Sequence, residues 1–164
     1  SLRVRAASAL LLRQAATDQL TGARMRFVGL DDAGRELERA RRNGGRLTLV
    51  FVGATTPDRP GDTTGRVAGD ALLKLVGETL RRNLRPYDVI VRYGGNEFVC
   101  LLPNVPGAEA RARFDRIASH LAAMDAEDSI TFGIAEALPT DTLHTLIARA
   151  NGDLREPKGA GEPL

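Results

Sequence analysis

The chain has 164 residues, of which 43% are hydrophobic and 27% charged, the balance of a globular domain with one core. A net charge of +2 is too small to indicate nucleic-acid binding, and no apolar run approaches the ~20 residues of a membrane-spanning helix, so we expect no membrane insertion of this segment. The single cysteine, Cys100, excludes an internal disulfide, and its apolar surroundings favour a buried thiol in a reducing, cytoplasmic compartment.

The N-terminal third predicts two helices. Residues 2–17 have helical apolar spacing without a breaker, so we expect residues 1–17 to be a helical linker from an upstream region. Residues 24–43 form an amphipathic pattern that ends at Gly44-Gly45, a helix stop signal. The side chains predicted to face the core from this second helix are Phe27, Val28, Leu30, Leu37 and Ala40.

The rest of the chain mixes strands and helices. Short apolar strands at 88–92 and 97–102 flank Gly94-Gly95, an arrangement that indicates a hairpin. A hairpin between strand–helix units favours an α+β sandwich with a mixed, mostly antiparallel sheet and helices outside. The other predicted elements are a strand at 47–52, helices at 67–84, 108–124 and 140–155, and a strand at 129–135.

Several motifs occur in one order along these elements. They are D-Q-L-T-G at 18–22, G-R-V-A-G-D at 65–70, R-P-Y-D-V-I-V-R-Y-G-G-N-E-F at 85–98, I-T-F-G-I-A at 130–135 and A-N-G-D-L-R-E-P-K-G-A-G at 150–161. With these motifs the chain resembles the GGDEF domains, the diguanylate cyclase family, over residues 18–161. It is similar to a degenerate member, because the signature reads G-G-N-E-F, and residues 162–164 are left as a tail.

This resemblance implies a fold and an activity. The fold is a central five-stranded sheet wrapped by helices, similar to the palm domain of adenylyl cyclases. Catalytic members of the family condense two GTP molecules into cyclic di-GMP, and two metal ions assist the nucleotidyl transfer. The protein is then expected to be the cytoplasmic part of a larger bacterial signalling protein, with or without a membrane anchor.

Two positions that carry metal-binding carboxylates in the family have changed. Gly53 stands at the first and supplies no side chain, while Asn96 stands at the second and is uncharged, a poor ligand for Mg²⁺. Glu97 is retained. Loss of a charged metal ligand lowers the rate by orders of magnitude, so we expect no functional catalytic residue, no metal site and no cofactor. Mg²⁺ enters only if residual GTP binding uses Glu97.

Other family positions leave a vestigial GTP site. Gly94, Gly95, Asp70 and Lys158 are retained, whereas Pro57, Asp58, Gly61 and Glu162 replace residues that bind the nucleotide in the family. Each survivor also has a structural interpretation. The glycines are needed by the hairpin turn, Asp70 is a candidate helix cap and Lys158 is a candidate solvated tail residue.

A second family site is intact. R-x-x-D at Arg85 to Asp88 matches the inhibitory site, which binds cyclic di-GMP as a stacked dimer, and Arg116 matches the arginine that completes it. Arginine forks phosphates or stacks on guanine, and the carboxylate accepts hydrogen bonds from the guanine edge.

Three functions remain open. The preferred one is a catalytically inactive receptor for cyclic di-GMP that signals through the N-terminal helix to an upstream or downstream domain. The second is an interaction or dimerisation module, such as a homodimer, with vestigial sites. The third is a weak diguanylate cyclase or a GTP-binding regulatory domain.

Overall fold

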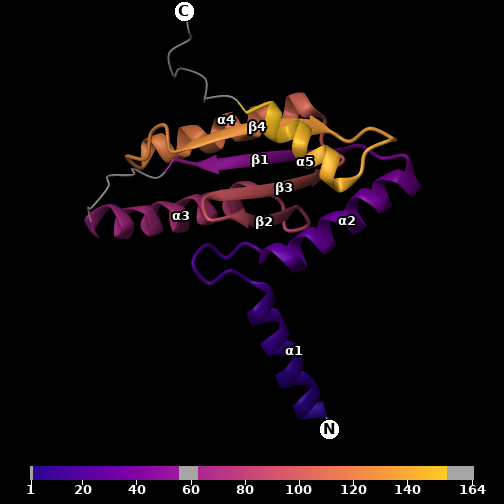
Figure 1. Ribbon diagram of the computed structural model, residues 1–164, viewed down its shortest axis with the longest axis horizontal. Coiled ribbons are helices and arrows are strands. Elements are labelled where there is room, and N and C mark those ends of the chain that lie inside the picture. The colour runs from indigo at the N-terminus through magenta and orange to yellow at the C-terminus, as the bar shows by residue number, and fades with distance from the viewer. Residues whose placement is uncertain (1, 56–62, 155–164) are drawn as a thin grey trace, which may run out of the picture.

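The fold is built on a four-stranded antiparallel sheet with strand order β2-β3-β1-β4. The computed structural model describes residues 2–55 and 63–154, and Figure 1 shows the sheet between helices, with the first helix leading away from it. The elements are α1 (Leu2–Ala16), α2 (Arg26–Asn43), β1 (Leu47–Ala54), α3 (Thr63–Asn83), β2 (Val89–Gly94), β3 (Glu97–Pro103), α4 (Gly107–Ala123), β4 (Ile130–Glu136) and α5 (Leu143–Gly152).

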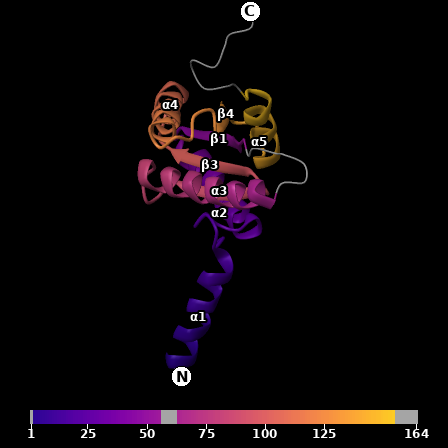
Figure 2. The ribbon, with the colours of Figure 1, turned by 90° about the vertical axis from the view of Figure 1, so that its left-hand side faces the viewer.

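Helices cover both faces of the sheet because β1 is apolar on both of its faces. Side chains alternate along a strand, so Val50 and Val52 enter the cluster formed with α3 and α4, whereas Leu49 and Phe51 enter the cluster formed with α2 and α5. Figure 2 shows α4 and α5 on opposite sides of β4. Cys100 is buried within the first cluster, as expected, and burial raises the pKa of its thiol.

The predicted order of elements and the α+β class are confirmed. The expected five-stranded sheet is represented by four strands within the described residues, and every strand pair in it is antiparallel. An isolated parallel bridge joins Arg24, just before α2, to Val91 of β2. The chain after residue 154, including the predicted tail, lies outside the described residues.

The predicted inner face of α2 is partly wrong. Phe27 is 91% exposed and Val28 is also exposed, at 37%, whereas the buried residues of the helix are Gly29, Ala33 and Leu37. The reason is the close approach of α2 to β2, since a Cβ atom on Gly29 would lie 2.6 Å from both methyl carbons of Val91. With Gly29 turned to the sheet, Phe27 is rotated by about 200° around the helix and faces solvent.

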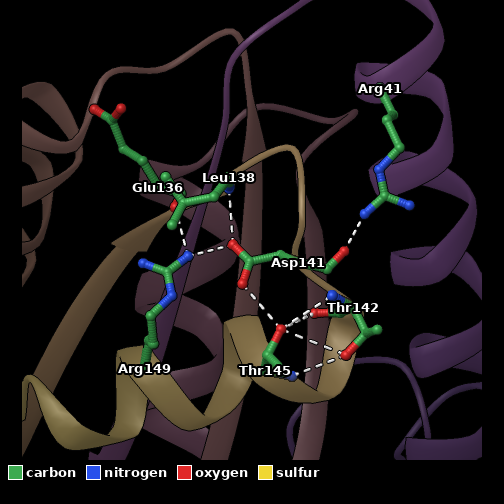
Figure 3. Close-up of polar contacts among 7 residues, drawn as sticks. All are labelled: Arg41, Glu136, Leu138, Asp141, Thr142, Thr145 and Arg149. Atoms are coloured by element: carbon green, nitrogen blue, oxygen red, sulfur yellow. Dashed lines mark hydrogen bonds and ion pairs between the residues drawn. The ribbon is translucent and has the colours of Figure 1, made fainter.

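The last helix starts later than predicted, because Asp141 organises a turn in front of it (Figure 3). The buried carboxylate of Asp141 accepts hydrogen bonds from Leu138 N (2.7 Å) and Thr145 Oγ1 (2.9 Å), and it pairs with Arg149. Burial alone would raise the pKa of Asp141, but these hydrogen bonds lower it below its ordinary value.

Two further contacts complete this turn. Thr142 caps α5 by accepting from Thr145 N (3.2 Å). Arg41 of α2 donates to the Asp141 carbonyl oxygen, and the turn is therefore fastened to both helices on this face of the sheet.

Helix α1 stands away from the sheet in both views, and its residues Leu2, Val4, Leu10 and Leu11 are exposed. It joins the body through a bridge between Thr17 and Arg24 and a hydrogen bond from Met25 N to Ala16 O (2.7 Å). No helix in the described ranges is long and apolar enough to cross a bilayer.

The packing of α5 on β4 predicts a strong effect at Gly133. A Cβ atom there would collide with the carbonyl oxygen of Ala150 and lie 2.6 Å from Leu154 N, and backbone atoms cannot move aside cheaply. We expect Gly133→Ala to lower the free energy of unfolding by about 1–3 kcal/mol, measured by urea denaturation. Gly34→Ala is the matched control. Its Cβ meets nothing within 4 Å, so this substitution on α2 should stabilise by about 0.5–1 kcal/mol. Equal stability of the two variants would contradict the packing described.

Candidate functional site

Gly53 lies between two polar side chains at the end of β1. It pairs with Glu97 of β3 and Thr131 of β4, and cross-strand partners project from the same face of a sheet. A Cβ atom on Gly53 would lie 3.0 Å from Thr131 Oγ1, which is tighter than ordinary contact. Thr131 therefore also limits the space for a side chain at position 53, where a metal ligand was predicted to be lost.

Asn96 is fastened to the same end of β1. Its side-chain Nδ2 donates to the backbone carbonyl oxygen of Ala54 (2.9 Å). Its backbone carbonyl oxygen accepts from Ala54 N (2.7 Å). Asn96 is an exposed residue of the turn before β3, whereas Ala54 is the last residue of β1. The amide thus links two segments that are 42 positions apart in the chain.

These residues do not fit a divalent metal ion. Mg²⁺ and Ca²⁺ take oxygen ligands, preferably carboxylates, but Gly53 has no side chain and Asn96 turns its N–H to the Ala54 carbonyl. Glu97 lies against Gly94, where a Cβ atom would collide with its Oε1. Within residues 2–55 and 63–154, no group of three or more His, Cys, Asp or Glu side chains could hold a metal.

The vestigial GTP positions are spread over several elements. Gly94 ends β2 at a register shift, and Gly95 lies exposed in the turn that follows. Asp70 is exposed on α3, which begins at Thr63, so the interpretation of Asp70 as a helix cap is wrong. The retained Lys158 lies outside the described residues. So do the four positions at which a nucleotide-binding residue of the family is replaced, Pro57, Asp58, Gly61 and Glu162.

The G-G-N-E-F turn is also tied to the segment that follows α1. Arg92 of β2 donates to Asp18 Oδ2 (3.0 Å) and to the carbonyl oxygen of Gly95 (2.7 Å). Asp18 also accepts from the backbone and hydroxyl of Thr21. Burial alone would raise the pKa of Asp18, but the hydrogen bonds from Thr21 and Arg92 lower it. Sequence reasoning missed this link, although Asp18 belongs to the D-Q-L-T-G motif.

The structure brings Arg85 and Asp88 together in one closed network. Asp88 accepts from Arg85 N (2.7 Å), from Arg85 Nε (3.3 Å) and from the guanidinium Nη2 (3.1 Å), and its side chain is 0% exposed. The same Nη2 donates to the carbonyl oxygen of Pro103 at the end of β3 (2.7 Å). Asp88 therefore orients Arg85, whose side chain stays 28% exposed.

Tyr87 is a residue of this site that sequence reasoning did not single out. The guanidinium carbon of Arg85 lies 4.4 Å from the centroid of the Tyr87 ring, and Tyr87 is 59% exposed. A cation above an exposed aromatic ring offers charge for a phosphate and a flat surface for a base. Arg116 is exposed on α4, and no hydrogen bond or ion pair in the described part of the chain joins it to Arg85 or Asp88.

Comparison with known proteins gives consistent matches. A family model described as diguanylate cyclase, GGDEF domain, matches residues 15–163. The diguanylate cyclase DgcP of Pseudomonas aeruginosa is 37% identical over 111 residues, which cover 68% of this chain and 16% of that protein. The response regulator PleD of Caulobacter vibrioides is 29% identical over 160 residues, covering 92% and 35%. The chain thus spans much less than two thirds of either relative.

Solved structures share the fold. The coiled coil and GGDEF domain of DgcB from Caulobacter crescentus, in complex with c-di-GMP, superposes with a TM-score of 0.82 at 24% identity, over 92% of this chain and 84% of that one. The GGDEF domain of TpbB from Pseudomonas aeruginosa gives a TM-score of 0.69 at 28% identity, over 85% and 91%.

The Asp18 network predicts a pH-dependent contribution to stability. Because the pKa of Asp18 is lower in the folded state than its value of about 3.9 in an unfolded chain, its contribution is complete above that value and is lost as pH falls through the folded pKa. We expect Asp18→Asn to lower the melting temperature at pH 7 and the difference from the unmodified protein to shrink below about pH 4, measured by thermal scans across pH. Asp31→Asn, which removes an exposed pair with Arg35, is the control and should change little at any pH. A difference in melting temperature between Asp18→Asn and the unmodified protein that stays constant with pH would contradict the ionic role of this carboxylate.

Proposed function

The chain belongs to the family of diguanylate cyclase GGDEF domains, and from this membership we propose that it binds cyclic di-GMP as a receptor instead of synthesising it. The observation that carries the proposal is the contrast between two sites on one domain. The catalytic position offers a glycine and an amide that is already hydrogen-bonded, whereas the Arg85–Asp88 network is complete and partly open to solvent.

The loss of catalysis follows from the ligand chemistry. Nucleotidyl transfer in this family depends on two cations that activate the nucleophile and neutralise charge on the phosphate. Gly53 and Asn96 leave Glu97 as the remaining acid of the three family positions. A single carboxylate does not assemble a two-metal centre, so the domain makes no cyclic di-GMP at a useful rate.

Ligand binding is supported by the state of Arg85. A guanidinium that is oriented by a buried carboxylate loses less side-chain freedom on binding, and this preorganisation favours affinity. Arg85 then forks a phosphate or stacks on a guanine, with Tyr87 beside it. Asp88, whose side chain is 0% exposed, supports binding by holding Arg85 in this orientation. Arg116 completes the site from its own surface or from a second copy, and a stacked dimer of cyclic di-GMP is the expected ligand.

Known complexes agree with this choice of ligand. The DgcB domain and a further microbial GGDEF domain of similar fold were both solved with c-di-GMP bound. At 24% identity these likenesses establish the fold alone, and the assignment of a ligand to this chain therefore depends on its own Arg85, Asp88 and Arg116.

The bound state is read out through α1. The G-G-N-E-F turn is tied by Arg92 to Asp18, two residues after the end of α1, so a change near β2 and β3 is passed to that helix. The partner is a signalling domain elsewhere in a longer cytoplasmic protein, or a second copy of the chain.

Binding of cyclic di-GMP is tested by isothermal titration calorimetry. We expect saturable heat for the unmodified domain and an affinity at least ~10-fold lower for Arg85→Ala, because a charge-assisted hydrogen bond contributes about 1.5–3 kcal/mol. Arg82→Ala is the matched control, since Arg82 is an exposed arginine in the last turn of α3 and should leave the affinity unchanged.

Two results would contradict the receptor proposal. They are the absence of heat with the intact domain and an unchanged affinity in Arg85→Ala. A melting temperature that cyclic di-GMP does not shift would instead favour an interaction or dimerisation module with vestigial sites, because a ligand of the folded state must raise it.

The catalytic part of the proposal is tested separately with GTP. The purified domain is incubated with GTP and Mg²⁺ or Mn²⁺, and the nucleotides are separated by chromatography. We expect unchanged GTP and no cyclic di-GMP, with the diguanylate cyclase DgcP of Pseudomonas aeruginosa in the same assay as the positive control. Product formation that is lost in Glu97→Gln would show that the domain is a cyclase.

A further inference from the structure

The amide of Asn96 occupies a point where two chain segments meet. Its Nδ2 lies 2.9 Å from the Ala54 carbonyl oxygen, and a backbone hydrogen bond of 2.7 Å runs the other way from Ala54 N to Asn96 O. Both bonds involve the same two residues. The backbone hydrogen bond can form with any residue at position 96, whereas the side-chain hydrogen bond from Asn96 Nδ2 to Ala54 O adds a second link, here called the clasp.

An aspartate in this place would face the same carbonyl with an oxygen. Two oxygen acceptors at about 3 Å repel each other unless a proton or a cation lies between them. Carboxylate and backbone carbonyl oxygens are both ligands that divalent cations accept, and the neighbouring Glu97 supplies a further carboxylate. The amide of Asn96 requires no cation, because its N–H group presents a partial positive charge to the Ala54 carbonyl oxygen.

We propose that the side-chain amide of Asn96 is a built-in replacement for a divalent cation, joining the end of β1 to the G-G-N-E-F turn by a hydrogen bond. Asn96 is then a positioning residue and not merely the remnant of a metal ligand. The site does not fit a metal ion as a consequence, because the N–H of Asn96 Nδ2 already points at the Ala54 carbonyl oxygen that a cation would bind. This inference holds whether or not the domain binds cyclic di-GMP.

The clasp lies at the end of a longer series of contacts. Asp18, after α1, holds Arg92, and Arg92 holds the carbonyl oxygen of Gly95, the neighbour of Asn96. Beyond Ala54, the backbone N–H of Thr55 donates to Ser129 O before β4 (2.7 Å). These hydrogen bonds of the chain itself thus hold the turn between the α1 junction and the end of β1.

The test measures the melting temperature of Asn96→Asp with EDTA and with millimolar Mn²⁺ or Ca²⁺. In EDTA we expect a decrease of about 3 °C or more, from the lost hydrogen bond and the repulsion between oxygens. The cation should restore at least half of that decrease, because it can bridge the carboxylate and the carbonyl. The unmodified domain should show no comparable response.

Two further variants separate the clasp from general effects. Asn96→Ala loses the donor without adding an acceptor, so it should melt lower in EDTA and gain nothing from the cation. Asn43→Asp adds a carboxylate at an exposed position at the end of α2 and controls for non-specific cation binding. Equal melting of Asn96→Asp and the unmodified domain in EDTA would overturn the proposal. A cation response of Asn96→Asp no larger than that of Asn43→Asp would overturn it as well.

Discussion

The pairing of β1 on both of its sides is the constraint on which this molecule depends. Its register with β3 and β4 sets Gly53 between Glu97 and Thr131, and it brings Ala54 beside the turn that carries Asn96. A central strand has no free edge, so nothing at its end can shift without breaking a ladder of backbone hydrogen bonds. The chemistry available there is accordingly fixed by the residues at the strand ends, which are Gly53 between Glu97 and Thr131, and by the neutral amide of Asn96 in the adjoining turn.

Two carboxylates of this domain serve as structural anchors for arginines. Asp88 holds Arg85 at the start of β2, and Asp18 holds Arg92 further along the same strand. In each case the carboxylate is well covered and the arginine extends to a backbone carbonyl, of Pro103 or of Gly95. A covered acid with several donors fixes a guanidinium more firmly than an exposed pair does, because water competes less for it. One such arginine lies in the proposed ligand site, and the other connects the turn to α1.

Much of this was predictable from local patterns. The order of elements follows from apolar periodicity, and the hairpin follows from Gly94-Gly95 between short apolar runs. The errors have tertiary causes. Phe27 is exposed because Gly29, and not an apolar side chain, lets α2 approach Val91. The last helix begins at Leu143 because Asp141 holds Leu138, Thr145 and Arg149 in a turn, with Arg41 from α2 donating to its carbonyl. Neither contact is visible in a helical repeat.

The sequence by itself determined the family, the α+β class and the absence of a side chain at Gly53, since these depend on residue identity and on spacing along the chain. It also determined that Arg85 and Asp88 are near one another, because they are three positions apart. Only the tertiary structure decided what Asn96 and Asp88 do. The partner of the Asn96 amide lies 42 residues away, and the Asp88 carboxylate is covered by the guanidinium that it was expected to assist. Hydrogen-bond partners and burial are properties of the packed chain, which no local pattern encodes.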